Sequence, residues 1–555
     1  MSDLSTVPGL LEHAAMGDGV VSILAAEREE AQFGQLWRRS ERAAACFLDA
    51  VEAGGTVALL METSLDCLVC VLGAWRAGVT TLSLPYPART TPVDAYREEL
   101  LDICRLAGVG LVVLPERFAG LALEGGICTA TYRECAAYGR RADVAVPGEF
   151  VQFSSGSTGR PKGVRLSSAA IAANVTAMIG HMAPHYEGAV AFSWLPLSHD
   201  MGLIGTCLTV LASMGPTWRS RRLALMPPER MVARPSRWLQ ACSEIGATVT
   251  CAPSFALDLV LAHPPANVDL RPLKVLVVGS EPIAPGTLSR FATALAPAGL
   301  DEAALCPAYG MAEAALAVTM VRPCERWHSA PGGAAGSEVV SCGAPLSCVE
   351  VRAPVGAVGA GPIAIRGTSL LTGYLGQAAS PLEEGWLATS DLGFQRDGEL
   401  YVVGRADDVL VIAGRKVYPE LLEKTAARHE AVRPGNCAAI PDGAGGYLIV
   451  AERRRASGGA DMREACRWIR RELSINGGAA PSAVVIVLPG SLPKTPSGKL
   501  QRRRLGQLHL RGELPVEAEV RFGRRPRQRG PGRRQKEEQP CMLWQQPVSP
   551  ARQTR

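Results

Sequence analysis

Between residues 30 and 140, helix-like segments alternate with short apolar runs. GQLWRRSERAAACFLDAVEAG, LDCLVCVLGAWRAG and REELLDICRLAG have the character of helices, whereas TVALLM, TTLSLP and VGLVVLP are short and apolar. Alternation of this kind is typical of a parallel sheet with crossover helices. The pattern therefore predicts an α/β fold for this part of the chain.

The same alternation continues towards the middle of the chain. VAFSWLPL, ATVTCAPS, LKVLVVGSEPI and ALCPAYG are short apolar runs that lead into polar loops. In open α/β sheets, ligands bind beyond the carboxyl ends of the strands. Four strand ends are therefore expected to contribute to one binding site.

The residue pattern of the sequence changes at two further points along the chain. After about Pro345, Gly and Asp punctuate short β-type stretches such as GPIAIRG and DGELYVVGRADDVLVIAG, which indicates a small β subdomain. From Gly414 to about Leu510, two helical and three strand-like segments predict an α+β unit. The chain of 555 residues is long enough for one large domain and a smaller partner.

Composition and charge exclude several classes of protein. Hydrophobic residues make up 47% and charged residues 20%, as in a folded globular protein. The net charge of +5 comes from the segment 521–555, which carries about +8 and leaves about −3 for the rest. This Arg-, Pro- and Gln-rich tail lacks hydrophobic periodicity and is expected to be disordered. A nucleic-acid partner is not expected, because no aromatic residues interleave the basic ones.

Targeting and metal signals are also absent from the sequence. No run reaches the roughly 18 uncharged apolar residues of a membrane span, and the first ten residues lack a basic stretch with an apolar run. A cytoplasmic location is the expectation. Cys67 and Cys70 have no second cysteine pair to complete a zinc site, so helix packing is their expected role.

The sharpest local signal is the loop FSSGSTGRPKG, from Phe153 to Gly163. Glycines let backbone N–H groups approach a ligand, the hydroxyls add donors, and Arg160 and Lys162 add positive charge, a combination that suits a polyphosphate. The spacing of a Walker A loop is not satisfied. A solvated flexible loop is the alternative.

Six further motifs follow this loop in a fixed order. They are WLPLSHDMGL, VGSEPI, AYGMAEA, TSDLGF, GRADDVLVIAG and PKTPSGK. Over roughly residues 30–508, the chain thereby resembles the adenylate-forming superfamily of acyl-CoA synthetases, peptide-synthetase adenylation domains and luciferases. SWLPLSHDMGLIG, VVGSEPI and LPGSLPKTPSGK look most like the fatty acyl-AMP ligases. The insertion that many of these ligases carry is absent between Gly373 and Trp386.

The resemblance implies a domain plan. Residues 1–403 would form an N-terminal adenylation domain with two α/β subdomains and a small β subdomain. Residues 404–410 would be the hinge, with Asp407 at its centre, and residues 411–510 a small mobile α+β domain. Residues 511–555 would be the disordered tail.

The resemblance also assigns the groups around ATP and Mg²⁺. Glu313 matches the family's acidic residue for Mg²⁺, a hard cation that prefers carboxylate and phosphate oxygens, with Thr158 beside it. A helix-starting glutamate is the alternative for Glu313, and Ala312 replaces a frequent Thr or Ser. The β- and γ-phosphates would be held by Ser154, Ser155, Gly156, Ser157, Thr158, Gly159 and Lys162.

The nucleoside would lie between three other segments. Tyr309 and Gly310 would contact the adenine from one side, because flat rings and bare backbone suit a purine. Asp391 matches the carboxylate that accepts hydrogen bonds from both ribose hydroxyls, with Arg405 in support. The other wall of the adenine site would be Gly279, Ser280 and Glu281.

Two further residues are implied in the chemistry. Lys499 would reach in from the small domain to neutralise charge shared by the carboxylate and the α-phosphate, and would withdraw when that domain rotates about Asp407. His199 would lie near the carboxylate of the acid. The segments Met201–Thr209 and Ala252–Leu259 are apolar and are expected to line the acid pocket.

The predicted function is ATP-dependent activation of a fatty acid as acyl-AMP, followed by transfer to the phosphopantetheine thiol of an acyl carrier protein. A fatty acyl-CoA ligase that uses free CoA shares every residue named so far. Amino-acid activation would need a carboxylate for the substrate ammonium, and Asp258 and Asp200 are the candidates. An aryl acid is a further alternative substrate. A catalytically silent nucleotide-binding relative is the remaining one.

Overall fold

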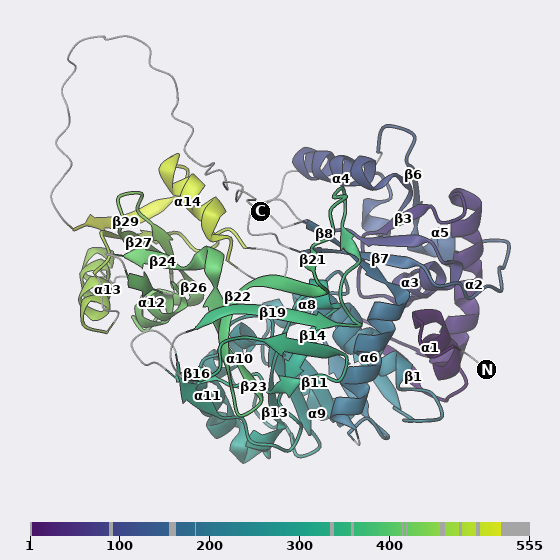
Figure 1. The fold of residues 1–555 in the computed structure, drawn as a ribbon, viewed down its shortest axis with the longest axis horizontal. Helices are drawn as coiled ribbons and strands as arrows, with labels where there is room; N and C mark the ends of the chain where they lie inside the picture. Colours follow the sequence, from purple (N-terminus) through teal and green to yellow (C-terminus); the bar gives the residue numbers. More distant parts are fainter. Residues whose placement is uncertain are drawn as a thin grey trace, which may run out of the picture.

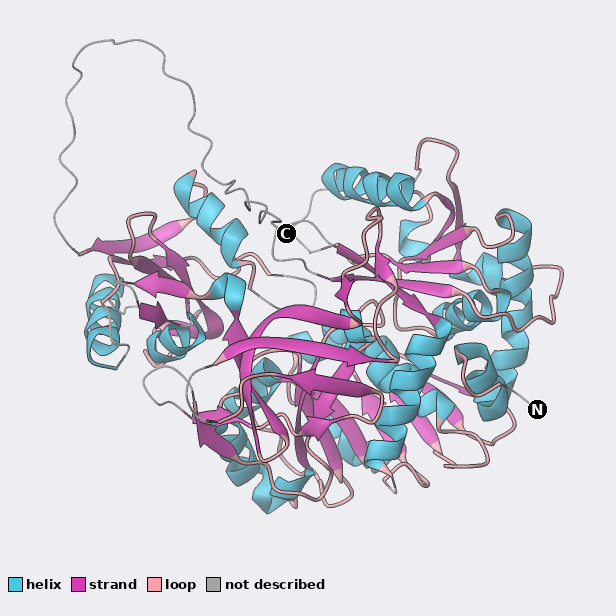
Figure 2. Cartoon of the chain, in the orientation of Figure 1, coloured by secondary structure: helices cyan, strands magenta, loops and turns pink. Residues whose placement is uncertain are grey.

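The molecule consists of a large N-terminal body and a smaller C-terminal unit beside it (Figure 1). Helices cover the faces of sheets in both parts (Figure 2). The expected α/β body with an α+β second part is confirmed. The computed structural model describes residues 3–87, 93–121, 123–154, 162–183, 185–332, 338–356, 360–412, 415–417, 419–455, 461–476, 480–494 and 500–522.

One sheet of the body contains seven strands among the described residues, and β7, β4, β3, β5 and β6 run parallel. Helices α2 (Phe33–Ala50), α3 (Leu65–Ala77) and α5 (Tyr132–Ala136) pack on one face, and α4 (Val93–Ala107) packs on the other. In spatial order the strands are β20 (Gly373–Tyr374), β8 (Lys162–Ser167), β7 (Glu149–Ser154), β4 (Thr80–Ser83), β3 (Thr56–Leu59), β5 (Val109–Leu114) and β6 (Cys128–Thr131).

The second sheet contains nine strands among the described residues, and its central strands from β10 to β13 are parallel. Helix α6 (Ser168–Met182) packs on one face, and α9 (Arg237–Ile245), α10 (Ser254–Ala262) and α11 (Pro285–Leu295) pack on the other. The order is β17 (Ala344–Pro345), β14 (Ala317–Met320), β13 (Leu305–Gly310), β12 (Val275–Gly279), β11 (Val249–Pro253), β9 (Val190–Ser193), β10 (Arg222–Leu225), β1 (Val20–Leu24) and β2 (Arg28–Gln32).

Helix α3 shows how the local sequence sets these elements. The side chain of Ser64 accepts a hydrogen bond from the backbone N–H of Cys67 at the start of α3, and Gly78 ends the helix with a φ of 68°. Cys67 and Cys70 are buried in the core between α3 and the sheet. Both side chains therefore contribute to helix packing. Among the described residues, no cluster of three or more His, Cys, Asp or Glu could hold a metal ion.

The predicted β subdomain lies between the body and the C-terminal unit. Its strands are antiparallel, and Ile363, Ile365, Leu387 and Leu400 join the core of the body. Because it packs against that core, the β subdomain is held in a fixed position on the side of the body that faces the C-terminal unit. The strands are β18 (Val349–Arg352), β19 (Gly361–Gly367), β21 (Leu382–Glu383), β22 (Trp386–Arg396) and β23 (Glu399–Arg405).

The C-terminal unit is a sheet with helices on both faces. One core packs the sheet against α12 (Pro419–Ala426) and α13 (Met462–Asn476), and a second packs it against α14 (Arg502–Leu510). A two-stranded ribbon of β24 (Leu410–Ile412) and β25 (Arg415–Val417) precedes it. The sheet order is β26 (Val432–Pro441), β27 (Tyr447–Arg453), β28 (Ala483–Val487) and β29 (Val516–Arg521).

Strand β29 corrects the expected boundary at residue 510. Residues 511–522 were expected to belong to the disordered tail, but β29 pairs antiparallel with β28 over Val516–Arg521. Leu514 and Ala518 are buried in the two cores of the unit, which offsets the ordering cost of this segment. Residues 523–555 lie outside the described residues. Among the helices that the structure describes, none is long and apolar enough to cross a membrane.

Candidate active site

A cavity of about 1400 Å³ lies where the strands of the second sheet end and the C-terminal unit faces the body. The carboxyl ends of β11, β12 and β13 open into it, as expected for a parallel sheet. Ten residues predicted for the site line this cavity together. They are Lys162, His199, Gly279, Ser280, Glu281, Tyr309, Gly310, Glu313, Asp391 and Arg405.

Asp391 is the centre of one polar cluster. It lies on β22 opposite Arg405 of β23, and the Nε of Arg405 is 3.5 Å from its Oδ1. The hydroxyl of Tyr309, at the end of β13, donates to Oδ2 of Asp391 over 2.7 Å. Burial, together with the charge of Asp391, raises the pKa of Tyr309 well above its usual value, so the hydroxyl stays a donor. The carboxylate is thereby fixed at the cavity wall.

Glu313 is the centre of a second cluster. It lies in the short helix η5 (Ala312–Ala314), and its Oε1 accepts a hydrogen bond of 3.1 Å from the hydroxyl of Tyr374 on β20. The Nζ of Lys162 lies 5.5 Å above the ring of Tyr374. Burial raises the pKa of the Glu313 carboxyl, and the bond from Tyr374 offsets part of that rise.

Most of the phosphate loop falls outside the described residues. Ser155, Gly156, Ser157, Thr158 and Gly159 are among those not described, and Ser154 is the last residue of β7. The hairpin of β7 and β8 pairs Ser154 with Lys162, so both ends of the predicted loop are anchored beside each other. Of the segment Phe153 to Gly163, the structure places Phe153 and Lys162 at the cavity.

The turn after β12 has an unusual backbone. Ser280 has a φ of 75°, a left-handed value that is rare for residues other than Gly and often marks a functional site. A Cβ on Gly279 would lie 3.0 Å from the carbonyl oxygen of Ala308, so the strand ends pack closely there. The carboxylate of Glu281 accepts a hydrogen bond from the backbone N–H of Phe255 in the first turn of α10.

His199 lies in the turn that follows β9. Its Nδ1 is 2.6 Å from Oδ1 of Asp200, and the backbone N–H of Met201 donates to the same Oδ1 over 2.7 Å. These contacts begin a π-helix, η2 (Met201–Leu208), a form that is frequent at functional sites. A Cβ on Gly202 would lie 2.2 Å from the carbonyl oxygen of Pro196, so this position requires glycine.

Tyr374 and Gln152 are among the cavity residues that were not predicted from the sequence. Tyr374 is 61 positions from Glu313, and Gln152 donates from Nε2 to the carbonyl oxygen of Ser198 over 2.9 Å. The Oε1 of Gln152 is buried without a hydrogen-bond partner among the described residues. No local motif surrounds Tyr374, and the only signal for Gln152 was its polar character within an apolar strand.

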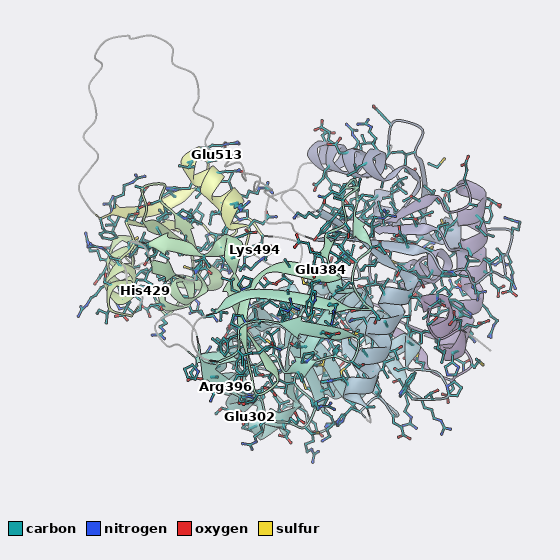
Figure 3. All side chains as sticks on the ribbon, in the orientation of Figure 1. Glu302, Glu384, Arg396, His429, Lys494 and Glu513 are labelled. Atoms are coloured by element: carbon teal, nitrogen blue, oxygen red, sulfur yellow. The ribbon has the colours of Figure 1, made fainter. Side chains whose placement is uncertain are left out.

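The C-terminal unit provides the opposite wall of the cavity. Arg502 binds both oxygens of Glu423 at 2.8 Å, and its Nη1 donates to Asp408 over 2.9 Å. Lys494 lies on the side of the C-terminal unit next to the body (Figure 3), and it donates to the carbonyl oxygen of Gly435 over 2.9 Å. Burial lowers the pKa of Lys494. Lys499 lies outside the described residues, although its neighbours Lys494 and Leu500 line the cavity.

Comparisons with known proteins agree with this geometry. The family model of the AMP-binding enzymes matches residues 11–375. The chain is 32% identical to the long-chain-fatty-acid–AMP ligase FadD26 of Mycobacterium bovis, over 81% of this chain and 86% of that protein. It is 31% identical to a putative acyl-CoA synthetase of Caulobacter vibrioides, over 92% of this chain and 96% of that protein.

Solved structures show the same fold. A structure from studies of fatty acyl-adenylate ligases of E. coli and L. pneumophila superposes with a TM-score of 0.82 at 24% identity, covering 92% of this chain and 98% of that one. A McyG adenylation structure complexed with phenylalanyl-adenylate gives 0.79 at 21% identity, covering 92% and 83%. The chain belongs to the AMP-binding enzyme family and is an adenylate-forming acyl ligase.

Proposed function

We propose that the protein activates a fatty acid as its acyl-AMP and transfers the acyl group to the phosphopantetheine thiol of an acyl carrier protein. The first step, adenylation, is supported by a single cavity that has both a polar part and an apolar part. Carboxylates with fixed donors line its mouth, and apolar side chains line the space behind them. Such a cavity suits a nucleotide beside an alkyl chain.

The polar mouth suits ATP. Asp391 can accept hydrogen bonds from both ribose hydroxyls, because Tyr309 and Arg405 already hold its carboxylate in place. The close packing at Gly279 and Ser280 leaves bare backbone beside the adenine site. Lys162 and the loop that precedes it would neutralise the β- and γ-phosphates.

Mg²⁺ fits the same cluster. This ion usually binds one or two carboxylates together with substrate phosphate oxygens, and it does not need an all-protein cage. Glu313 offers one carboxylate at the cavity wall, on the side of Lys162, and Thr158 would add its hydroxyl. When bound, the ion neutralises the phosphates and assists pyrophosphate departure.

The acid site favours an uncharged chain. Asp258, one candidate partner for a substrate ammonium, is 3.1 Å from Arg290 and within 3.3 Å of the hydroxyl of Thr287. Asp200, the other candidate, accepts from Met201 and lies against His199. Both carboxylates already have partners, which argues against amino-acid activation. The long-chain-fatty-acid specificity in the name of FadD26 points in the same direction.

The first half-reaction joins the two substrates. A carboxylate oxygen of the acid attacks the α-phosphorus, the bond from that phosphorus to the bridging β-oxygen breaks, and pyrophosphate leaves. His199 would orient the carboxylate from the turn after β9. Lys499 would neutralise the charge that the carboxylate and the α-phosphate share.

The second half-reaction needs a thiol. A thiolate sulfur would attack the acyl carbonyl, and AMP would leave with the electrons of the broken C–O bond. The wall that the C-terminal unit presents carries Lys424, Arg428, Arg503 and Arg504, whose side chains are exposed. Such a basic wall complements an acidic carrier domain and its phosphodiester. It also suits the phosphates of CoA, which makes free CoA the second candidate acceptor.

Identification of the reaction products tests both half-reactions. The purified protein is incubated with Mg-ATP and fatty acids, with free CoA, with a phosphopantetheinylated carrier protein, or with neither, and the products are identified by mass. We expect acyl-AMP that persists with CoA and disappears with the carrier protein. Acyl-CoA would instead establish the CoA ligase reaction, and no adenylate from any fatty acid would contradict the proposal.

A further inference from the structure

The inner part of the cavity runs along the strands of the second sheet, away from the nucleotide mouth. Val249, Cys251 and Pro253 alternate along β11 and so face one side, and all three line the cavity. Val277 lines it from β12, where it pairs with Cys251. At about 3.3 Å per residue, Val249 lies roughly 13 Å deeper than Pro253. The inner cavity is therefore a long recess.

Most other residues that line the recess are apolar. Met178 and Met182 lie one turn apart on α6 and line the side opposite the sheet, and Met320 lines the recess from β14 of the sheet itself. Thr206 is polar, but its Oγ1 donates to the carbonyl oxygen of Met201 over 3.2 Å and lies 2.7 Å from the Sγ of Cys251. The thiol of Cys251 and the hydroxyl of Thr206 therefore form a hydrogen bond with each other.

Tyr186 differs from these neighbours. It follows α6 and lines the recess near the amino ends of the strands, with 1% of its surface exposed. Its backbone carbonyl accepts from Ser220 over 2.9 Å and from the N–H of Ala189 over 3.2 Å, which fixes its position. Among the described residues, its phenol hydroxyl has no hydrogen-bond partner.

A hydroxyl on an almost fully buried side chain at a cavity wall is stabilised when a bound molecule offers it a hydrogen-bond acceptor. Burial, and then the nearby Cys251, raise the pKa of Tyr186, so the hydroxyl remains protonated and available as a donor. An unsubstituted alkyl chain would leave this donor unpaired. An oxygen atom on the distal part of the chain would accept its hydrogen bond.

We infer that Tyr186 forms a polar subsite at the inner end of the acyl recess, selecting a fatty acid that carries a hydroxyl or keto oxygen near its distal end. This inference rests on the proposed activation of a fatty acid and specifies its substrate class. It makes Tyr186 a specificity-determining residue, remote from the reacting carboxylate. A site built to bond a hydroxyl discriminates against the analogue that lacks it.

The test compares each acid from octanoic to tetradecanoic with its ω-hydroxy analogue, by pyrophosphate release with Mg-ATP. At the chain length that reaches Tyr186, we expect kcat/KM for the hydroxy acid to exceed that for the plain acid by about tenfold. Tyr186→Phe should bring this ratio to about one. Tyr132→Phe is the control, since it removes the hydroxyl of another buried tyrosine, on α5, that lies outside the cavity.

Two other outcomes separate this inference from the proposed function. A wild-type enzyme that prefers the plain acid at every length, with a ratio unaffected by Tyr186→Phe, overturns the subsite and leaves fatty-acid activation standing. If no acid yields pyrophosphate, the proposed function fails, and calorimetry of 12-hydroxydodecanoate binding then decides the subsite. Binding that Tyr186→Phe weakens supports the subsite, and equal or absent binding overturns it.

Discussion

The polar side chains on the two walls of the cleft are held in different ways. On the N-terminal wall they bond to one another, as Tyr309 does to Asp391 and Tyr374 to Glu313. On the C-terminal wall, Arg503 and Arg504 are exposed, whereas Arg502 ties α14 to the segment that joins the two parts. The first wall is built before substrate arrives, whereas we propose that the second contributes to one step and then withdraws.

The largest effect should come from the loop of the C-terminal unit. We expect Lys499→Ala to lower adenylate formation about a thousandfold while ATP binding is retained, because its charge is needed only as the phosphorus is attacked. Pyrophosphate release and ATP binding by calorimetry measure the two quantities. Lys494→Ala is the comparison variant, and it should cost far less. Equal losses in both variants would contradict the distinct role of Lys499.

Asp391→Asn tests the prebuilt wall. Asparagine keeps one acceptor oxygen but replaces the other by an NH2 donor, so the variant can no longer accept from both ribose hydroxyls and loses the ion pair with Arg405. The value of kcat/KM for ATP should therefore fall about a hundredfold. Asp397→Asn is the control, because Asp397 is exposed in the turn of the same hairpin and asparagine tolerates its φ of 53°. An unchanged KM for ATP in Asp391→Asn would place the ribose elsewhere.

The pH profile tests Glu313. Its carboxylate must be ionised to hold Mg²⁺, and burial raises its pKa, so activity should be lost on acidification at a higher pH than for an ordinary glutamate. Tyr374→Phe removes a hydrogen bond that lowers this pKa, and it should move the acidic limb of kcat/KM for ATP further upwards. If the acidic limb of the profile moves to lower pH or does not move, Glu313 does not control it.

Asp408→Asn tests the connection between the walls. Arg502 keeps both hydrogen bonds to Glu423 in this variant. Because the ion pair between Arg502 and Asp408 is partly exposed, its loss should lower the free energy of unfolding by only about 1 kcal/mol. The C-terminal unit should stay folded, while limited proteolysis between residues 404 and 410 becomes faster. Adenylate formation should fall less than tenfold. Proteolysis at the wild-type rate would mean that the pair does not restrain this segment.

Removal of residues 523–555 should have the smallest effect. The described C-terminal unit already has its sheet and both cores without them. Pyrophosphate release by the truncated chain should stay within about twofold of the full chain. A large loss would assign the basic tail a part in the reaction. Truncation after residue 510 should instead destabilise the unit, because it also removes β29.

The sequence predicted those parts of the fold and of the site that depend on a pattern within a single segment. Alternating helical and apolar runs predicted the parallel sheets, and the ordered motifs predicted ten residues that the fold brings to one cavity. Tyr374 and Tyr186 escaped prediction because their significance depends on neighbours distant in sequence. Strand β29 escaped because its charged, short segment is ordered by pairing with β28, which local composition does not show.

The central claim is that the cavity joins a fatty acid to AMP. Mass detection of acyl-AMP, with equimolar pyrophosphate release, from Mg-ATP and a series of fatty acids tests it most directly. The account predicts adenylate formation with the wild-type chain, a large loss in Lys499→Ala, and normal rates in Asp397→Asn. Adenylates from amino or aryl acids but from no fatty acid would contradict it.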